Sequence, residues 1–225
     1  MRFEKLKNIV DVKKGKKPSF VDEPDDNSVR VLQIDDLRND DAPKFTNDRT
    51  GVLANEDDIL IAWDGANAGT IGYGKAGYIG STIALLRKKQ PERYSTTFIG
   101  KFLQSKYDHL RGKTTGATIP HISRKALDEL EIPVISIDDQ HHIAQLLSQA
   151  EQLIAQRQES IRLLDAYLKS TFLEMFGDPV RNEKGFLKQK LSTLTKIGTG
   201  GTPSRKKEIE FYNGHIPWIK TTEVN

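Results

Sequence analysis

The sequence predicts an α+β fold, in which a mixed α/β domain over residues 1–135 is followed by a long coiled-coil-forming helix over residues 136–178. Short β-branched runs bounded by polar residues indicate strands in the first part. One apolar spacing that persists for about four and a half heptads indicates the helix. A repeat of the amino-terminal sequence indicates that residues 179–225 are the truncated start of a second domain of the same fold.

Three strands are predicted in the first domain, at residues 29–34 (VRVLQI), 58–63 (DILIAW) and 81–86 (STIALL). The glycines scattered between residues 65 and 80 favour hairpins and loops over a helix in that interval. A helix is predicted from Ser95 to Arg111, because apolar residues recur there at helical spacing and a glycine closes the pattern. Ser123 is expected to cap a short helical turn that leads towards the long helix.

The segment from Gly69 to Lys75 (GTIGYGK) has the spacing of a phosphate-binding P-loop up to its lysine. Ala76 stands where that motif needs a metal-binding hydroxyl, and no long helical pattern follows. We therefore interpret the segment as part of a glycine-rich hairpin and not as a nucleotide site.

The long helix has clear sequence signals at both ends. Ser136 followed by Asp139 is a capping-box pattern, and Asp138 adds negative charge to the first turn. Gly177 can adopt the left-handed conformation that ends a helix, and Pro179 prevents continuation. About 40 residues at a rise of about 1.5 Å give a rod of roughly 60 Å.

The apolar residues of this helix follow an alternating four-three step, which predicts a seam that packs against another helix. Arg157 and Thr171 interrupt the seam, and a second apolar row beside it indicates more than one neighbour. A helix folded back on its own domain is the alternative, but the length and the sustained register argue against it. The residues predicted to contact a partner helix are Ile143, Leu147, Ile154, Ile161, Leu164, Leu168, Phe172 and Met175.

Residues 185–225 repeat the amino terminus at an offset of 185 residues. Lys5 and Leu6 match Lys190 and Leu191, and the predicted strand at 29–34 falls, after a two-residue adjustment, on residues 216–221 (IPWIKT). A long helix therefore separates two copies of one kind of domain, and the second copy stops early.

Composition excludes several classes of protein. The chain has 225 residues, 29% of them charged, a net charge of +3 and a mean hydropathy of −0.54. No apolar run approaches the length of about 18 residues that a membrane span needs. Cysteine is absent, so neither disulfides nor thiolate metal sites are available. We expect a cytoplasmic protein that makes no membrane contact.

The spacing of titratable residues gives no indication of catalysis. The five histidines lack metal-ligand spacing, and His141 and His142 lie on adjacent faces of the long helix. No nucleophile, base and orienting acid form a group in the sequence. We therefore predict no catalytic residue, no metal and no cofactor, and we do not expect an enzyme.

Charge is distributed unevenly along the first domain. Residues 75–125 contain eleven Lys or Arg against two acidic residues, whereas residues 20–64 contain four against thirteen. A solvated surface explains such runs as readily as a phosphate-binding face does. A basic loop at 13–17 and a Gly-Thr loop at 112–122 (GKTTGATIPHI) carry DNA-binding residue types, although either also suits a simple connection. The candidate DNA-binding residues are Lys13, Lys14, Lys16, Lys17, Lys75, Lys113, Thr114 and Thr115.

Three stretches resemble the specificity subunit of type I restriction-modification enzymes. They are residues 116–135 (GATIPHISRKALDELEIPVI), residues 140–180 with the helix that ends in MFGDPV, and the pair 200–204 (GGTPS) and 215–220 (HIPWIK). The helix is the most specific of them. Residues 1–115 match the family only in layout, as expected of the part that differs with the target sequence.

The resemblance implies a target-recognition domain at 1–135 that reads one half of a bipartite site in double-stranded DNA, a conserved spacer helix, and a second domain for the other half. It also implies a non-catalytic subunit on which modification (methyltransferase) and restriction subunits dock. Because the second domain ends early, we expect a homodimer through the long helix that reads an interrupted palindrome. The alternative is a helical assembly scaffold whose globular head binds protein through the acidic segment at 20–64.

Overall fold

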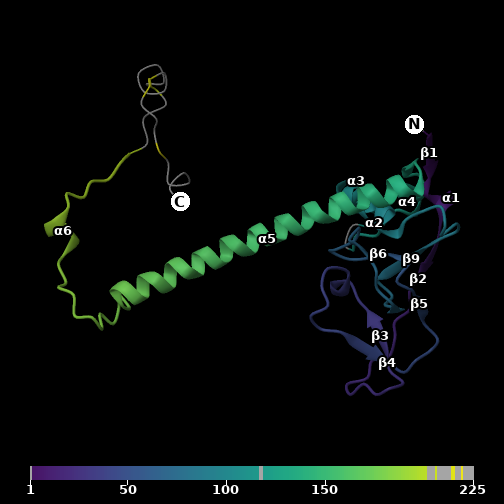
Figure 1. Ribbon diagram of the computed structural model, residues 1–225, viewed down its shortest axis with the longest axis horizontal. Helices are drawn as coiled ribbons and strands as arrows, with labels where there is room; N and C mark the ends of the chain where they lie inside the picture. Colours follow the sequence, from purple (N-terminus) through teal and green to yellow (C-terminus); the bar gives the residue numbers. More distant parts are fainter. Residues whose placement is uncertain (1, 117–118, 202–205, 207–213, 216–218, 220–225) are drawn as a thin grey trace. The chain divides into compact units, whose positions relative to one another are not determined.

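The structure, a computed structural model, describes residues 2–116, 119–201, 206, 214–215 and 219 (Figure 1). The chain divides into two compact units, Met1–Ile161 and Arg162–Asn225, and each is described by itself. The chain up to residue 134 mixes sheets with short helices, and one long helix follows and continues into the second unit. This arrangement confirms the predicted α+β class. Most of the predicted second-copy strand at 216–221 lies outside the described residues.

A central antiparallel sheet forms the middle layer of the first unit. Its strands, in order, are β2 (Val10–Lys14), β9 (Ile83–Lys88), β6 (Ile59–Ala62) and β7 (Ile71–Tyr73). Strand β6 is apolar throughout because both of its faces are buried. Ile59 and Ile61 pack in a core with the helices, whereas Leu60 and Ala62 pack in a second core with the other large sheet.

The second sheet covers one face of the central sheet. Its strands, in order, are β4 (Lys44–Thr46), β3 (Val29–Leu32), β8 (Gly77–Ile79) and β5 (Val52–Ala54). Strands β3 and β8 are parallel, and the other two pairs are antiparallel. The 3-10 helix η1 (Asp35–Leu37) follows β3 and buries Leu37 in the same core.

The other face of the central sheet is covered by short helices. They are α1 (Leu6–Ile9), α2 (Thr96–Ser105), α3 (Tyr107–Gly112) and α4 (Arg124–Asp128). Strands β1 (Arg2–Lys5) and β10 (Glu131–Val134) form a separate antiparallel pair, so the chain enters and leaves this region side by side. Ser123 caps α4 as predicted, since its hydroxyl accepts a hydrogen bond from the Ala126 N–H at 3.3 Å.

The three predicted strands are confirmed as β3, β6 and β9, and the glycine-rich interval supplies the β6–β7 hairpin. The P-loop-like segment contributes β7, and strand β8 follows it where a P-loop would start a helix. Sequence reasoning missed several other strands, such as β4 and β5, because their pairing across the sheet stabilises them more than local propensity does.

Two predictions about local structure were wrong. The helix expected from Ser95 to Arg111 is broken at Lys106, whose N–H bonds to the Leu103 carbonyl in a tighter turn, while the Ser105 hydroxyl donates to the Phe102 carbonyl. The basic loop expected from residue 13 begins later, because Lys13 and Lys14 still belong to β2 and pair with β9.

Helix α5 (Ile137–Phe176) lies within the predicted range 136–178 and ends two residues before it does (Figure 1). The Ser136 hydroxyl accepts from the Asp139 N–H at 3.1 Å and donates to the Asp139 carboxylate at 2.6 Å, so Ser136 caps the helix as predicted, although the carboxylate bonds the Ser136 hydroxyl and not its backbone N–H. The first turns pack on the first unit through Gln140 and Ala144, which are buried. Beyond them Lys101 of α2, whose side chain is 4% exposed, binds Glu151 at 2.6 Å.

The predicted seam residues of α5 are exposed in the single chain. Exposure of the side chains rises from 37% at Ile143 to about 60% at Ile161 and Leu164. In the second unit Gly177, with φ of +72°, ends the helix as predicted, and Lys184 donates to the carbonyl of Met175 at 2.9 Å. A short helix, α6 (Leu191–Leu194), follows.

Candidate nucleic-acid interface

The Gly-Thr loop at 112–122 is attached to the connection between β6 and β7. The Ile122 N–H donates to the Trp63 carbonyl, and the Gly65 N–H donates to the Pro120 carbonyl, both at 2.9 Å. The Arg111 guanidinium also donates to the Ala66 carbonyl. These contacts hold the end of the Gly-Thr loop at the edge of the central sheet.

The base of the Gly-Thr loop is closed by backbone pairing. Thr115 and His121 exchange two N–H···O bonds of 2.9 and 2.8 Å. Gly116 has φ of +95°, and a Cβ there would lie 2.4 Å from the Ile119 carbonyl oxygen. Only glycine fits this position without displacing the backbone, so the sequence specifies the backbone conformation at Gly116.

Asp64 joins the Gly-Thr loop to the end of β2. Its carboxylate lies 2.6 Å from the Lys14 ammonium and 2.5 Å from His121 Nδ1. Burial alone would raise the pKa of the Asp64 carboxyl, but hydrogen bonds and charge attraction from Lys14 and His121 outweigh burial and lower it below its usual value. Asp64, Lys14 and His121 together are called the Asp64 cluster. It joins two segments that were predicted separately to bind DNA, through a residue that the sequence analysis did not select.

The lysine loop, residues 15–17, starts at a tightly fitted glycine. The Gly15 N–H donates to the Ile83 carbonyl at 2.9 Å, and a Cβ at this position would lie 2.3 Å from the Gly80 carbonyl oxygen. The loop therefore rests directly on the backbone that leads from β8 to β9. Lys16 and Lys17 follow with exposed side chains. Hydrogen bonds from the Thr50 backbone and hydroxyl lower the pKa of Asp48, and the positive charge of Lys16 makes a smaller contribution in the same direction.

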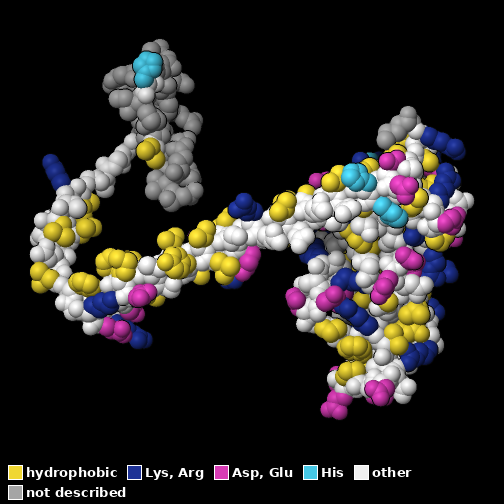
Figure 2. All heavy atoms as spheres, in the orientation of Figure 1, with side chains coloured by type: hydrophobic (Ala, Val, Ile, Leu, Met, Phe, Trp, Pro, Cys, Tyr) yellow, Lys and Arg dark blue, Asp and Glu magenta, His cyan; other side chains and the backbone are white. Residues whose placement is uncertain are grey.

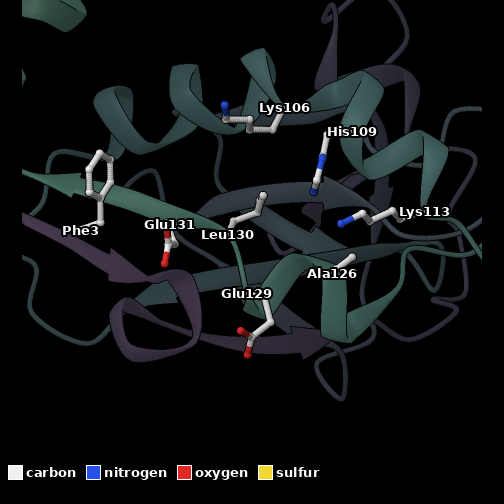
Figure 3. A pocket seen from close by; sticks show the side chains of 8 residues that line it. All are labelled: Phe3, Lys106, His109, Lys113, Ala126, Glu129, Leu130 and Glu131. Carbon is white, nitrogen blue, oxygen red and sulfur yellow. The ribbon is translucent and has the colours of Figure 1, made fainter.

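The other predicted DNA-binding residues occupy different surroundings. Lys75 precedes β8, at the opposite end of that strand from the contact with Gly15, and binds Asp40 at 2.6 Å. Lys113 lines a cavity of about 400 Å³ with Lys106 and His109 (Figure 3). The Thr114 hydroxyl donates to the Arg111 carbonyl at 3.0 Å.

The cavity in Figure 3 carries both signs of charge. Lys106, His109 and Lys113 lie on one side, and Glu129 and Glu131 lie on the other. Glu129 is already bound by Lys5 and by Lys7, the latter at 3.2 Å. A cavity with compensated charge gives no clear preference for an anionic or a cationic ligand.

The basic segment 75–125 and the acidic segment 20–64 do not form two separate faces of the first unit. Six of the eleven basic residues between 75 and 125 have a carboxylate oxygen within 4 Å, and Asp40 and Asp58 of the acidic segment supply two of these. Figure 2 shows Lys and Arg interspersed with Asp and Glu on the visible face of the first unit. The basic residues nearest the Asp64 cluster, and not the whole run, define the candidate interface.

The described residues contain neither a metal site nor a membrane-spanning helix. Among the described residues, no group of three or more His, Asp and Glu side chains is placed to hold a metal ion. In the same part of the chain, no helix is both long and apolar enough to cross a membrane.

Comparison with known proteins decides the family. Residues 1–163 match the family described as Type I restriction modification DNA specificity domain. The chain belongs to this DNA specificity family. The resemblance seen in residues 116–135 and in the long helix is thereby confirmed.

Two curated relatives in this specificity family come from Methanocaldococcus jannaschii. The type I restriction enzyme MjaVIII specificity subunit is 32% identical over 183 residues, which cover 80% of this chain and 43% of that protein. The MjaIX specificity subunit is 27% identical over 132 residues, which cover 52% of this chain and 30% of that protein. The chain thus spans less than half the length of the curated relatives it matches.

Solved structures show the same fold. A chain from a structure concerned with complex assembly and conformational transition of the type I R-M system superposes with a TM-score of 0.62 at 22% identity, covering 76% of this chain and 43% of that one. The HsdS subunit from Thermoanaerobacter tengcongensis gives a TM-score of 0.55 at 21% identity, covering 71% and 39%.

Two residues of the interface, Asp64 and His121, were missed by sequence reasoning. Asp64 lies two residues after the fully buried strand β6 and directly before a glycine with φ of +93°, a pattern that often marks a functional strand end. His121 stands within the stretch that carried the family resemblance. Neither signal shows that the two side chains meet, because 56 residues separate them in the sequence.

Proposed function

We propose that this chain is a DNA sequence-recognition subunit of a type I restriction-modification complex and reads one half of a bipartite site. In this proposal residues 1–135 form the target-recognition domain, 136–178 the spacer helix, and 179–225 the start of a second recognition domain. The observation that carries the proposal is the convergence of the lysine loop and the Gly-Thr loop at the Asp64 cluster, in a chain of the specificity family.

The two loops have different tasks in this proposal. Lys13, Lys16 and Lys17 are exposed and suit phosphate oxygens, which carry no sequence information. Thr115 is exposed at the base of the Gly-Thr loop, where its backbone pairs with His121, and its hydroxyl suits a base edge. Methyl transfer and DNA cleavage belong to the modification and restriction subunits, so the chain itself needs no catalytic residue, metal or cofactor. Its place is the cytoplasm, where the DNA lies.

Duplex binding by the full chain tests this proposal. Selection from a random pool, with the modification subunit present, should enrich one sequence, and the affinity for it should fall steeply as salt rises. Replacing Lys16 and Lys17 with alanine should weaken binding to all duplexes and reduce the salt slope by about 2. Enrichment of no sequence at all would refute sequence recognition, and an unchanged salt slope would refute the placement of the phosphate contacts.

We further propose that the isolated chain forms a two-fold homodimer through α5 and reads an interrupted palindrome. The support is the seam of apolar residues, which is exposed over most of its length and coloured yellow along the helix in Figure 2. Two copies related by a two-fold axis present the same recognition domain twice, each to one half-site. Rigid helices fix the distance between the two half-sites.

A charge placed in the seam tests the dimer. Leu164→Glu puts a carboxylate in the middle of the interface, at a cost on the order of a few kcal/mol where it stays unpaired. Ala166→Glu is the matched control, because residue 166 lies about 200° further round the helix. Light scattering at micromolar concentration should report a monomer for Leu164→Glu and a dimer for Ala166→Glu and the wild type. A wild-type monomer would contradict both the interface and the palindrome.

A further inference from the structure

The Asp64 cluster suggests how the two loops are kept in register, an inference that rests on the proposed DNA reading. The Asp64 side chain is 14% exposed, whereas its two partners, Lys14 and His121, are each about half exposed. A largely buried carboxylate thus holds two surface side chains that come from different parts of the chain. The β6–β7 hairpin, in turn, anchors this carboxylate to the central sheet.

Backbone pairing does not link the lysine loop to the Gly-Thr loop directly. The lysine loop is anchored by β2 to β9, whereas the Gly-Thr loop is anchored by Ile122 and Pro120 to the β6–β7 connection. In the part of the chain that the structure describes, the side-chain contacts that connect the two loops run through Asp64. Backbone bonds tie the bases of both loops to the start of β9, from Gly15 to Ile83 and from Trp63 to Thr82, and the Asp64 carboxylate adds a direct side-chain link between the two segments.

A carboxylate beside a phosphate-binding loop is unfavourable for simple DNA affinity. It repels phosphates, and it occupies the Lys14 ammonium that would otherwise add to the positive potential. Its presence is reasonable where geometry matters more than charge, because base-edge hydrogen bonds are sensitive to the placement of the loop that carries them.

We propose that Asp64 is a positioning residue for DNA reading, which fixes the Gly-Thr loop relative to the lysine loop through His121 and Lys14. In this role Asp64 increases the discrimination between target and non-target sequences. It does not increase the general affinity for duplex DNA, because its negative charge repels phosphates.

The experiment compares two duplexes, the one selected by the wild-type chain and a scrambled version of it. For Asp64→Asn, the ratio of the two affinities should fall about tenfold, as expected for loss of one good base contact, while affinity for the scrambled duplex stays equal or rises. Asp64→Glu should restore part of the ratio. Asp48→Asn is the matched control, because it removes a carboxylate near Lys16 that bridges no loops, and it should keep the wild-type ratio.

A second variant, His121→Ala, keeps the experiment decisive if Asp64→Asn fails to fold. It removes the end of the Asp64 contact that belongs to the Gly-Thr loop, so it should lower the ratio by a similar factor. A ratio within twofold of wild type in either variant, or an equal loss of affinity for both duplexes, would overturn the inference. A wild-type chain that selects no sequence would refute the proposed function itself.

Discussion

Gln140 offers a sharp test of how α5 is attached to the first unit. Its side chain is fully buried and makes three hydrogen bonds. The amide oxygen accepts from the Ser95 N–H at 2.9 Å, and the amide nitrogen donates to the Arg93 and Ile135 carbonyls at 3.0 and 3.1 Å. One side chain on α5 therefore satisfies backbone groups at the start of α2 and at the end of the β10 segment. Gln140→Ala removes all three bonds.

The cost of this substitution follows from the groups left behind. Each buried backbone group that loses its partner costs about 1–3 kcal/mol, and entry of water into the polar hole recovers part of this. We expect Gln140→Ala to lower the free energy of unfolding by about 3 kcal/mol. For a domain of roughly 150–250 residues this corresponds to a decrease in Tm of about 6–12 °C.

Thermal unfolding followed by circular dichroism measures this effect. Gln145→Ala is the matched control, because it removes the same side chain from an exposed position on the same helix. The control should stay within about 0.5 kcal/mol of the wild type. If Gln140→Ala also melted at the wild-type temperature, the attachment of α5 through this amide would be refuted.

Four further substitutions test other parts of the structure. Gly15→Ala places a Cβ against the Gly80 carbonyl oxygen, so it should displace the lysine loop and weaken binding to all duplexes in a titration. Thr115→Val should change the sequence enriched by selection more than the affinity for scrambled DNA. Leu6→Ala should lower the free energy of unfolding by about 2–5 kcal/mol, whereas Leu191→Ala should change it by less than about 0.5 kcal/mol, because Leu6 is buried and Leu191 is exposed.

The long helix was the most predictable part of the fold, because its signals are local. The capping residue Ser136, the terminating Gly177 and the heptad spacing all act within a few residues of the backbone they specify. The break at Lys106 was not predictable in the same way, since the apolar spacing continues across it. The short strands were missed because their stability comes from partners far along the chain.

The candidate interface was only partly predictable for a related reason. Residue type and glycine content identified the lysine loop and the Gly-Thr loop, but charge counts in the sequence also selected Lys75, which the structure pairs with Asp40. Whether a lysine is free or bound depends on carboxylates brought close by the sheet topology. Asp64 illustrates the same point, because its importance lies in two contacts that no spacing in the sequence reveals.

The internal repeat shows which features of the structure come from the local sequence and which come from distant contacts. Helices α1 and α6 occupy equivalent positions of the repeat, and their preceding residues, Lys5 and Lys190, have nearly the same backbone angles, with φ of −69° in both and ψ of 139° and 134°. Yet Leu6 is 1% exposed and Leu191 is 63% exposed. Similar local sequence therefore produces similar backbone in both copies. Burial of Leu6 depends instead on the segment of α4 and β10, whose Leu130 carbonyl accepts the Leu6 N–H, and these elements come more than a hundred residues later in the sequence. It follows that the repeated segment specifies its short helix locally, whereas the burial of Leu6 in a core comes from the contacts that α4 and β10 supply.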